Sequence, residues 1–361
     1  MGSVQWWMEM TMCERDGTFF RNFSRRSFLK TSAAGAATVA IPAHLAALLA
    51  PTRAMAATTI KATHGSGFCN MGIFLAKERG LTQADGVDLE FVVTPTNTEI
   101  STMFGAGLVD MSMIPYSNFM TLYDAGAPVK IVAGGGVQGC IIVAKEGITS
   151  AADLKGKTLG TFQADTLEVL PYDYLKKAGL SFRDVEVKYL DNSPELAQAF
   201  MVGALDAISA IEPYATQCVQ QRKGATVLSD GIDIYGKGYS DCVLAARVPL
   251  IEKNPAAVKA VIKALMTAQS QVEADKEAAL KDTVGKYYKT SMEAAVMASS
   301  RQPVCVDQRN QTQFIIDRGV SMKELGYIKK LPDQGAFDWS LLEAVIQDNK
   351  ALYDGLKLKS A

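Results

Sequence analysis

The chain has 361 residues, of which 48% are hydrophobic and 21% are charged, with 37 basic against 38 acidic side chains. This balance is typical of a globular protein and excludes low-complexity, collagen-like and wholly disordered chains. The small net charge, without a block of like charges, excludes the basic footprint of a nucleic-acid-binding protein. Beyond the N-terminal region there is no run of about 20 strongly apolar residues, which excludes a polytopic membrane protein.

The first 56 residues have the composition of an export signal. A pair of arginines, Arg25 and Arg26, stands in the string SRRSFLK, and an uncharged, alanine-rich stretch follows over residues 31–50. A membrane anchor is the alternative, but alanine drives membrane insertion poorly. The sequence therefore predicts a twin-arginine signal over residues 1–56, with cleavage near Ala56, export by the twin-arginine machinery and a periplasmic protein.

Five cysteines follow the predicted signal. Their odd number and irregular spacing predict buried, apolar-like thiols rather than a disulfide framework. They are Cys69, Cys140, Cys218, Cys242 and Cys305.

From Thr58 onward, short β-rich runs alternate with helical segments. Strands are expected at residues 59–63, 87–93, 110–114 and 129–133, with helices at 72–79, 99–104 and 118–125. This alternation predicts a mainly parallel sheet with helices on both faces.

The same order of elements begins again after Lys145. Strands are expected at residues 157–162, 185–190 and 207–210, and helices at 167–178, 195–201 and 214–222. The pattern FxxGxVD at residues 104–110 returns as FxxGxLD at residues 200–206, at the same point of each half. In both copies the glycine suits the left-handed end of a helix. We therefore expect two similar α/β lobes.

The last third of the chain is helical, with helices expected at residues 256–286, 292–300, 308–325 and 339–356. Two apolar, strand-like segments at 139–144 and 241–245 join the lobes. The middle lobe is then inserted into the first, so that lobe I comprises residues 58–140 plus 245–361 and lobe II comprises residues 141–244. Such a two-crossing hinge predicts a ligand held in a cleft between the lobes.

Four strings support a resemblance to a known family. They are GIFLAKERGL at residues 72–81, GAGLVD at 105–110, GITSAADLKGK at 147–157 and IEPY at 211–214. With them the chain resembles the periplasmic substrate-binding proteins of ABC importers for nitrate, sulfonates and taurine, which include thiamine-pyrimidine binders. The resemblance covers about residues 60–356. It implies an α/β, two-lobed type II periplasmic binding protein fold with two hinge crossings. It also implies a monomer without cofactor that delivers a small solute to a membrane permease and its ATPase.

Motifs for an enzyme are weak. The glycine-containing strings at residues 65–67 and 156–158 lack the further glycines of a dinucleotide fingerprint and of a phosphate loop. The less favoured alternative is a secreted hydrolase that uses Cys69 or Ser66 with His64 as its base, but the sequence offers no orienting partner. No His/Cys pair has the spacing of metal ligands, so the sequence predicts neither catalytic residues nor a metal site.

Ligands of open α/β sheets bind beyond the carboxyl ends of the strands, near helix N-termini. The loops at these places predict a site of Ser66, Gly67, Phe68, Cys69, Asn70, Thr96, Asn97, Thr98, Tyr116, Ser117, Gln163, Asp165, Thr166, Asn192, Glu212, Tyr214 and Asp241. Thr98, Ser117 and Thr166 have an alternative role as helix caps. Tyr116 and Tyr214 are expected to form walls of the cleft.

The predicted loops contain acidic side chains but no Arg or Lys. Carboxylates oppose an inorganic anion and favour a ligand that carries an amine or an N–H-rich ring. We therefore expect a solute of the sulfonate or taurine type, with its anionic end at residues 96–98 and Ser117 and its nitrogen end at Glu212 or Asp165. A thiamine-pyrimidine-like or other nitrogen heterocycle, nitrate, and a role in sensing instead of import are the open alternatives.

Overall fold

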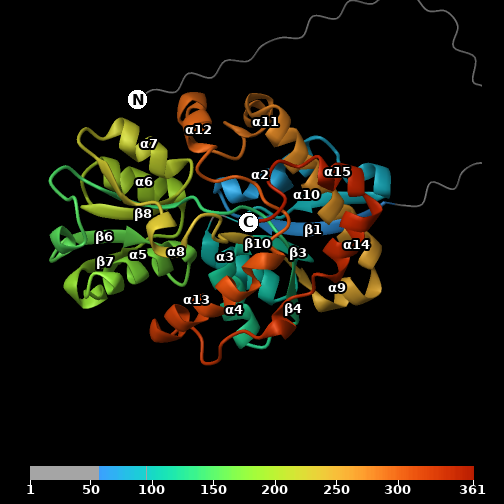
Figure 1. The fold of residues 1–361 in the computed structure, drawn as a ribbon, viewed down its shortest axis with the longest axis horizontal. Coiled ribbons are helices and arrows are strands. Elements are labelled where there is room, and N and C mark those ends of the chain that lie inside the picture. Colours follow the sequence, from blue (N-terminus) through green and yellow to red (C-terminus); the bar gives the residue numbers. More distant parts are fainter. Residues whose placement is uncertain (1–56, 95) are drawn as a thin grey trace, which may run out of the picture. The chain divides into compact units, whose positions relative to one another are not determined.

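The computed structural model describes residues 57–361 apart from Pro95. The predicted signal peptide and its cleavage near Ala56 lie outside the described residues. The described chain forms two α/β lobes, each built on a five-stranded sheet (Figure 1). None of the helices within this part of the chain combines the length and hydrophobicity that crossing a membrane requires.

The lobe I sheet has the strand order β2-β1-β3-β10-β4. β1 runs parallel to β2 and β3, whereas β10 runs antiparallel to β3 and β4. The strands are β1 (Thr58–His64), β2 (Val87–Phe91), β3 (Met111–Pro115), β4 (Val129–Gly134) and β10 (Cys242–Arg247), and the intervening helices are α2 (Met71–Glu78), α3 (Asn97–Gly105) and α4 (Tyr116–Asp124). These elements lie close to the predicted ones, because strongly alternating patterns specify element type well.

The lobe II sheet repeats this topology in the order β7-β6-β8-β5-β9, with β5 as its antiparallel strand. Its strands are β5 (Cys140–Ala144), β6 (Thr158–Thr161), β7 (Glu186–Tyr189), β8 (Ala207–Ile211) and β9 (Thr226–Ser229), and its helices are α5 (Thr166–Lys177), α6 (Ser193–Met201), α7 (Tyr214–Gln221) and α8 (Ile232–Tyr235). In each lobe the antiparallel strand is the one that arrives from the other lobe.

The repeated sequence pattern has the same structural role in both lobes. Gly107 and Gly203 have φ angles of +75° and +85°, the left-handed region in which glycine carries no steric penalty. The following aspartates each accept a backbone N–H from the equivalent strand of their sheet, β1 in lobe I and β6 in lobe II. Asp110 Oδ2 accepts the Lys61 N–H at 2.9 Å, and Asp206 Oδ2 accepts the Thr158 N–H at 2.9 Å.

The second crossing between the lobes lies earlier than the sequence predicts. β10 begins at Cys242 and pairs only with lobe I strands among the described elements, so residues 242–244 belong to lobe I and not to lobe II. The two crossing segments pair with each other through an antiparallel bridge between Val137 and Ser240. Both crossings are apolar and strand-like, and only the pairing partner, which is distant in sequence, decides to which sheet such a segment belongs.

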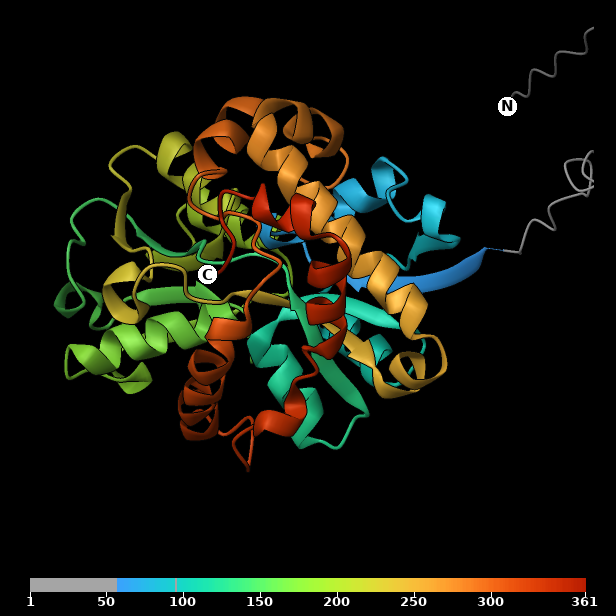
Figure 2. The ribbon, with the colours of Figure 1, turned by 45° about the vertical axis from the view of Figure 1, so that its right-hand side comes forward.

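The C-terminal third packs mainly on lobe I, and its helices are shorter than expected. They are α9 (Val248–Lys253), α10 (Pro255–Ala274), α11 (Lys276–Thr283), α12 (Met292–Ala298), α13 (Thr312–Glu324), α14 (Ser340–Asp348) and α15 (Lys350–Asp354). The predicted helix 256–286 is broken at Asp275, whose side chain accepts the Ala278 N–H and starts α11. The predicted helix 339–356 is likewise interrupted at Asn349. α14 and α15 lie beside α10 (Figure 2).

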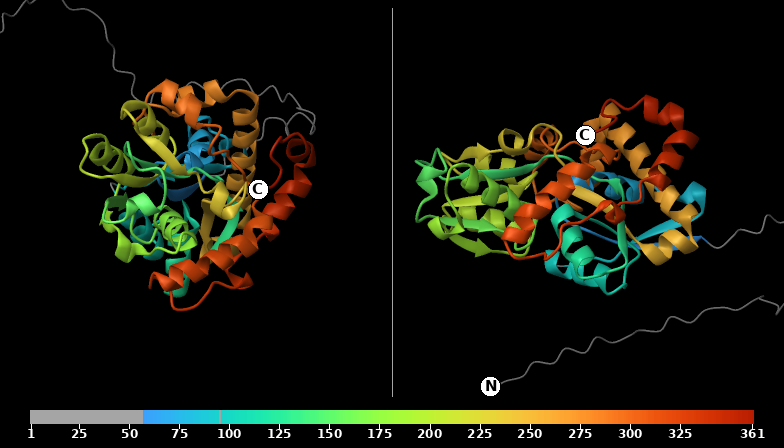
Figure 3. Two further views of the ribbon diagram at one scale, coloured as in Figure 1. Left: turned by 60° about the vertical axis from the view of Figure 1, so that its left-hand side comes forward. Right: turned by 60° about the horizontal axis from the view of Figure 1, so that its bottom comes forward.

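Two of these C-terminal helices also contact lobe II, which the sequence does not predict. α12 packs on α7, and α13 packs on both α4 and α5 (Figure 3). Lobe II is therefore held by two hinge strands and by helical contacts from the C-terminal segment.

Candidate functional site

Two cavities lie at the boundary between the lobes. The inner one has a volume of about 40 Å³, and the outer one of about 670 Å³. They are neighbours, because Gly65, Ser66 and Ile100 line both. The inner cavity has room for about three waters at roughly 10–15 Å³ each. A larger solute can therefore occupy it only when the lobes move apart.

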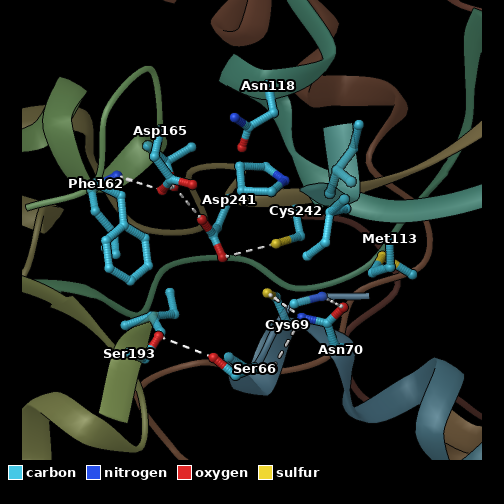
Figure 4. Close-up of a pocket in the computed structure, with 18 of the residues that line it drawn as sticks. Ser66, Cys69, Asn70, Met113, Asn118, Phe162, Asp165, Ser193, Asp241 and Cys242 are labelled. Carbon is cyan, nitrogen blue, oxygen red and sulfur yellow. Dashed lines mark hydrogen bonds between the residues drawn. The ribbon is translucent and has the colours of Figure 1, made fainter. Parts of the chain in front are cut away.

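Helix N-termini from both lobes converge on the inner cavity (Figure 4). Its wall includes Asn118 in the first turn of α4, Thr166 at the start of α5 and Ser193 at the start of α6. The remaining surface is largely apolar, with Ile100, Met113, Ile114, Pro115, Phe162, Leu167 and Ile211. Each helix start follows a strand, as expected for the binding edge of α/β sheets.

Asp165 is a buried carboxylate with one free oxygen. It is 2% exposed and caps α5, where its Oδ1 accepts the Leu167 N–H at 3.0 Å. Its Oδ2 has no hydrogen-bond partner among the described residues, and the residue lines the inner cavity. Burial, partly opposed by the Leu167 N–H, raises the pKa of this carboxyl to about 7.

Asp241, at the second crossing, is also buried in the cavity wall. Its Oδ1 accepts the Thr166 hydroxyl at 2.8 Å, and its Oδ2 accepts the Gln302 amide at 2.8 Å. The Cys140 and Cys242 thiols lie 3.3 and 3.4 Å from its oxygens. Burial raises the pKa of Asp241, with these donors opposing the shift. Unlike Asp165, this carboxylate has a hydrogen-bond partner in the protein on each of its two oxygens.

The cysteine thiols of the site are protonated at neutral pH. Burial raises the pKa of Cys69 to about 12 and that of Cys140 and Cys242 well above the usual range. Because the thiolate is the nucleophile, these thiols are poor nucleophiles. All five cysteines of the described chain are free and buried.

His64, the histidine of the hydrolase alternative, faces the outer cavity. Its Nδ1 lies 2.9 Å from the Gly65 carbonyl, and its ring packs edge-on against Phe74 and Phe91. Burial lowers its pKa, so the ring is neutral. Within the described residues it forms no hydrogen bond to a cysteine or serine. In the described residues His64 is therefore not paired, as a base with its nucleophile, to Cys69 or Ser66.

The two cavities differ in charge. Among the described residues, the inner lining contains two carboxylates and no Arg, Lys or His. The outer lining contains Lys77, Lys286 and Lys289 together with the carboxylates Glu78 and Glu90. Lys286 pairs with Glu78 and Lys77 lies 3.6 Å from Asp88, whereas Lys289 has no ion pair within the described chain. The inner cavity suits a hydrogen-bond donor, and the outer cavity offers a cation.

Among the described residues, direct hydrogen bonds join the lobes across the cleft. The Ser66 hydroxyl donates to Ser193 Oγ at 3.0 Å, and the Thr98 hydroxyl donates to Asp191 Oδ1 at 3.2 Å. The Asn118 amide donates to the Ala164 carbonyl at 3.3 Å. These direct contacts belong to a closed arrangement of the lobes around the inner cavity.

The structure places the predicted site residues in three groups. Ser66, Gly67, Cys69, Asn70, Asp165, Thr166 and Asp241 line the inner cavity, and Ser66, Thr96, Asn192 and Tyr214 line the outer one. Phe68, Thr98, Tyr116, Ser117, Gln163 and Glu212 line neither, and the side chain of Asn97 lies outside the described part of the chain.

Glu212 and Tyr116, both predicted to meet the ligand, line neither cavity in the structure. The Glu212 carboxylate is fully buried, accepts the Thr216 N–H and hydroxyl at 2.9 and 2.7 Å, and faces Arg301 at 3.4 Å. Tyr116 is buried in lobe I against Phe314. Each side chain is buried among neighbours that its local sequence does not reveal.

The sequence also missed part of the lining. The apolar side chains Met113, Phe162 and Ile211 carry no signal that distinguishes a cavity wall from a core. Tyr287 and Lys289 of the outer cavity come from the C-terminal segment, far from every predicted loop.

Comparisons with known proteins identify relatives. A model of the family described as "NMT1/THI5 like" matches residues 68–279. A protein of Brucella abortus, named as a binding protein, is 30% identical over 218 residues, which are 60% of this chain and 66% of the relative, just under two thirds of its length. A protein of Escherichia coli, named as an aliphatic sulfonates-binding protein, is 33% identical over 138 residues, 38% of this chain and 42% of the relative.

A solved structure and a second family model support the fold and the export signal. The structure of a periplasmic nitrate-binding protein of Synechocystis PCC 6803 is similar with a TM-score of 0.69 and 17% identity, covering 84% of this chain and 91% of that one. This likeness confirms the two-lobed fold. A model of twin-arginine signal sequences matches residues 22–42, which confirms the predicted signal and the periplasmic location.

Proposed function

Because the chain belongs to the NMT1/THI5-like family, we propose that it is the solute-binding component of an ABC importer and that its inner cavity receives the nitrogen-bearing end of a small organic solute. In this role it would carry the solute through the periplasm to a membrane permease with its ATPase. The observation that carries the proposal is the unpaired Oδ2 of Asp165 in the wall of a cavity between two lobes.

A buried carboxylate oxygen without a partner is costly unless a donor reaches it. A ligand ammonium or ring N–H would supply that donor, and an ammonium would also stabilise the ionised carboxylate. Nitrate or sulfate would bring a second negative charge beside Asp165 and Asp241, which opposes binding. The charge of the inner cavity thus supports a nitrogen-bearing ligand.

The outer cavity suits the other end of a taurine-like solute. Lys289 lines it without an ion pair in the described chain, and the two cavities meet at Ser66. The predicted anion contacts at Thr98 and Ser117 are less suitable. The Thr98 hydroxyl already binds Asp191, and Ser117 is buried outside both cavities. We therefore assign the sulfonate of such a solute to the outer cavity.

Calorimetry on protein recovered from the periplasm tests this assignment. Taurine, an alkanesulfonate of equal length, nitrate and an aminopyrimidine are titrated in turn into the wild type and Asp165→Asn. Asparagine keeps the helix cap, so the fold is preserved. The variant is expected to bind the amine-bearing ligand about 10- to 100-fold more weakly, equivalent to about 1.5–3 kcal/mol for a charged hydrogen bond. The alkanesulfonate should be much less affected.

Asp153→Asn is the matched control, because Asp153 is an exposed carboxylate of the same lobe outside both cavities. Its affinities should equal those of the wild type. Tight nitrate binding without any response to the organic ligands would refute the proposal. A preference for the aminopyrimidine would keep Asp165 as the anchor but replace the sulfonate with a nitrogen heterocycle. Recovery of each ligand with unchanged mass would separate binding from hydrolysis.

A further inference from the structure

We propose that Cys69, Asp241 and Cys242 form a binding site for a thiophilic divalent ion of the Zn²⁺ type in the wall of the inner cavity. This inference is independent of the solute proposed above, since it rests on a different set of side chains. Two thiolates and one carboxylate are a donor set that Zn²⁺ accepts.

The geometry of the three donors fits a single ion. Cys69 Sγ, one Asp241 oxygen and Cys242 Sγ all lie within 4.8 Å of one another. The Cys242 Sγ is 3.4 Å from Asp241 Oδ2. A tetrahedral zinc ion with bonds of about 2.0–2.3 Å holds neighbouring ligand atoms about 3.5–3.8 Å apart. Small side-chain rotations are therefore enough to close the site, and Figure 4 shows both sulfur atoms directed toward the Asp241 carboxylate.

The surroundings hold the carboxylate in place. The Thr166 hydroxyl and the Gln302 amide each donate to Asp241 at 2.8 Å. Such outer contacts orient metal ligands in known sites. On binding, the two S–H protons are released to solvent and metal–sulfur bonds form in their place, with no change of oxidation state.

The inner cavity supplies access and a further coordination position. All three donors line it, and its volume of about 40 Å³ accommodates a water. Three protein ligands with a fourth position open to water are the pattern of zinc sites that remain accessible to small molecules. The sequence could not indicate the site, because Cys69 and Cys242 come from the two separate chain segments of lobe I, which meet through the pairing of β3 with β1 and with β10.

Cobalt titration of metal-free protein from the periplasm tests the proposal. Co²⁺ replaces Zn²⁺ and reports thiolate ligands through charge-transfer absorption and four-coordination through intense visible bands. We expect one Co²⁺ per chain, displaced by one Zn²⁺. Cys69→Ser and Cys242→Ser should weaken binding at least a hundredfold and remove the charge-transfer absorption. Cys218→Ser and Cys305→Ser, which alter buried thiols outside both cavities, should bind as the wild type does.

X-ray absorption on zinc-loaded wild-type protein keeps the test decisive even when a serine variant fails to fold. Two sulfur and two oxygen or nitrogen neighbours are expected around zinc. A shell of oxygen and nitrogen alone, no stoichiometric metal, or equal losses in the Cys218 and Cys305 variants would overturn the site. None of these outcomes would bear on the binding of an amine through Asp165, so the two proposals fail separately.

Discussion

At the scale of single residues, two buried carboxylates of lobe II differ in their hydrogen-bond partners. Asp165 and Glu212 both follow strands of lobe II, and both were predicted to meet the ligand. The Glu212 carboxylate accepts a hydrogen bond from Thr216 and pairs with Arg301, whereas Asp165 Oδ2 has no partner among the described residues. The loop positions could be predicted from the α/β pattern. Which carboxylate stays unpaired depends on side chains such as Arg301, 89 positions away in the chain, which no local pattern reveals.

The pH dependence of stability tests the state of Asp165. Burial raises its pKa to about 7 from 3.8, so the folded protein binds this proton more tightly than the unfolded chain does. Stability is therefore lost as the pH rises from 3.8 to about 7, because the unfolded chain ionises first; the loss is constant above pH 7 and absent below 3.8. Asp165→Asn removes this cost. The melting temperature of the variant relative to wild type should be several degrees higher at pH 8 than at pH 5.

Asp153→Asn provides the comparison, since backbone and side-chain hydrogen bonds from Thr149 and Ser150 lower the pKa of that exposed carboxyl. Both its folded and unfolded forms are ionised throughout this range, so its effect should not change between pH 5 and pH 8. If the difference in melting temperature between Asp165→Asn and the wild type is also the same at pH 5 and at pH 8, Asp165 is already ionised in the folded protein at pH 5.

At the scale of elements, α13 is predicted as a helix but not as a contact between lobes. Asp173 of α5 accepts the Arg318 guanidinium at 2.6 Å, the Ser321 hydroxyl at 2.6 Å and the Tyr235 hydroxyl at 2.8 Å. Arg318 also lies over the Tyr235 ring. The amphipathic pattern of residues 308–325 indicates a buried face and cannot indicate its partner, because many apolar surfaces satisfy the same pattern.

Breaking this contact should destabilise the protein and loosen the lobes. Asp173→Asn leaves the Arg318 guanidinium, whose side chain is 25% exposed, without its charge partner. We expect a loss of about 2 kcal/mol in the free energy of unfolding, less than for a fully buried pair. Urea unfolding measures the loss, and small-angle scattering without ligand should give a larger radius of gyration.

Lys176→Gln is the matched control in the same interface between α5 and α13. It removes the ion pair of Lys176 with Glu324, in which both side chains are exposed to solvent. Exposed pairs contribute about 0–1 kcal/mol. Equal effects of the two substitutions would contradict a special role of Asp173.

At the scale of the whole molecule, the order of elements and the two-lobed insertion were predictable, because duplication and alternation repeat over long stretches. The boundary of lobe II and the breaks at Asp275 and Asn349 were not. A single capping residue decides where a helix ends, and long-range pairing decides which sheet a hinge strand joins. The cavity lining is the least predictable feature, since it is assembled from loops of both lobes and from the C-terminal segment.

The twin-arginine signal can be tested by substitution of its arginine pair. Replacement of Arg25 and Arg26 by Lys should block export, because the twin-arginine route reads the arginine pair. Immunoblots of cell fractions are expected to show precursor in the cytoplasm and none of the protein in the periplasm. Arg21→Lys, a charge-conserving change just outside the pair, should be exported normally. A normal periplasmic yield from the double variant would assign export to another route.

The bridge between Val137 and Ser240 has a consequence for how such proteins diversify. Because lobe II leaves and rejoins lobe I at adjacent backbone positions, residues between the two crossings form a cassette with neighbouring ends. A cassette of this kind can be exchanged among relatives without cutting any strand of the lobe I sheet. Recombination at the two crossings would then join the Asp165 wall of one protein to the lysine-bearing wall of another, and new solute preferences could arise from existing halves.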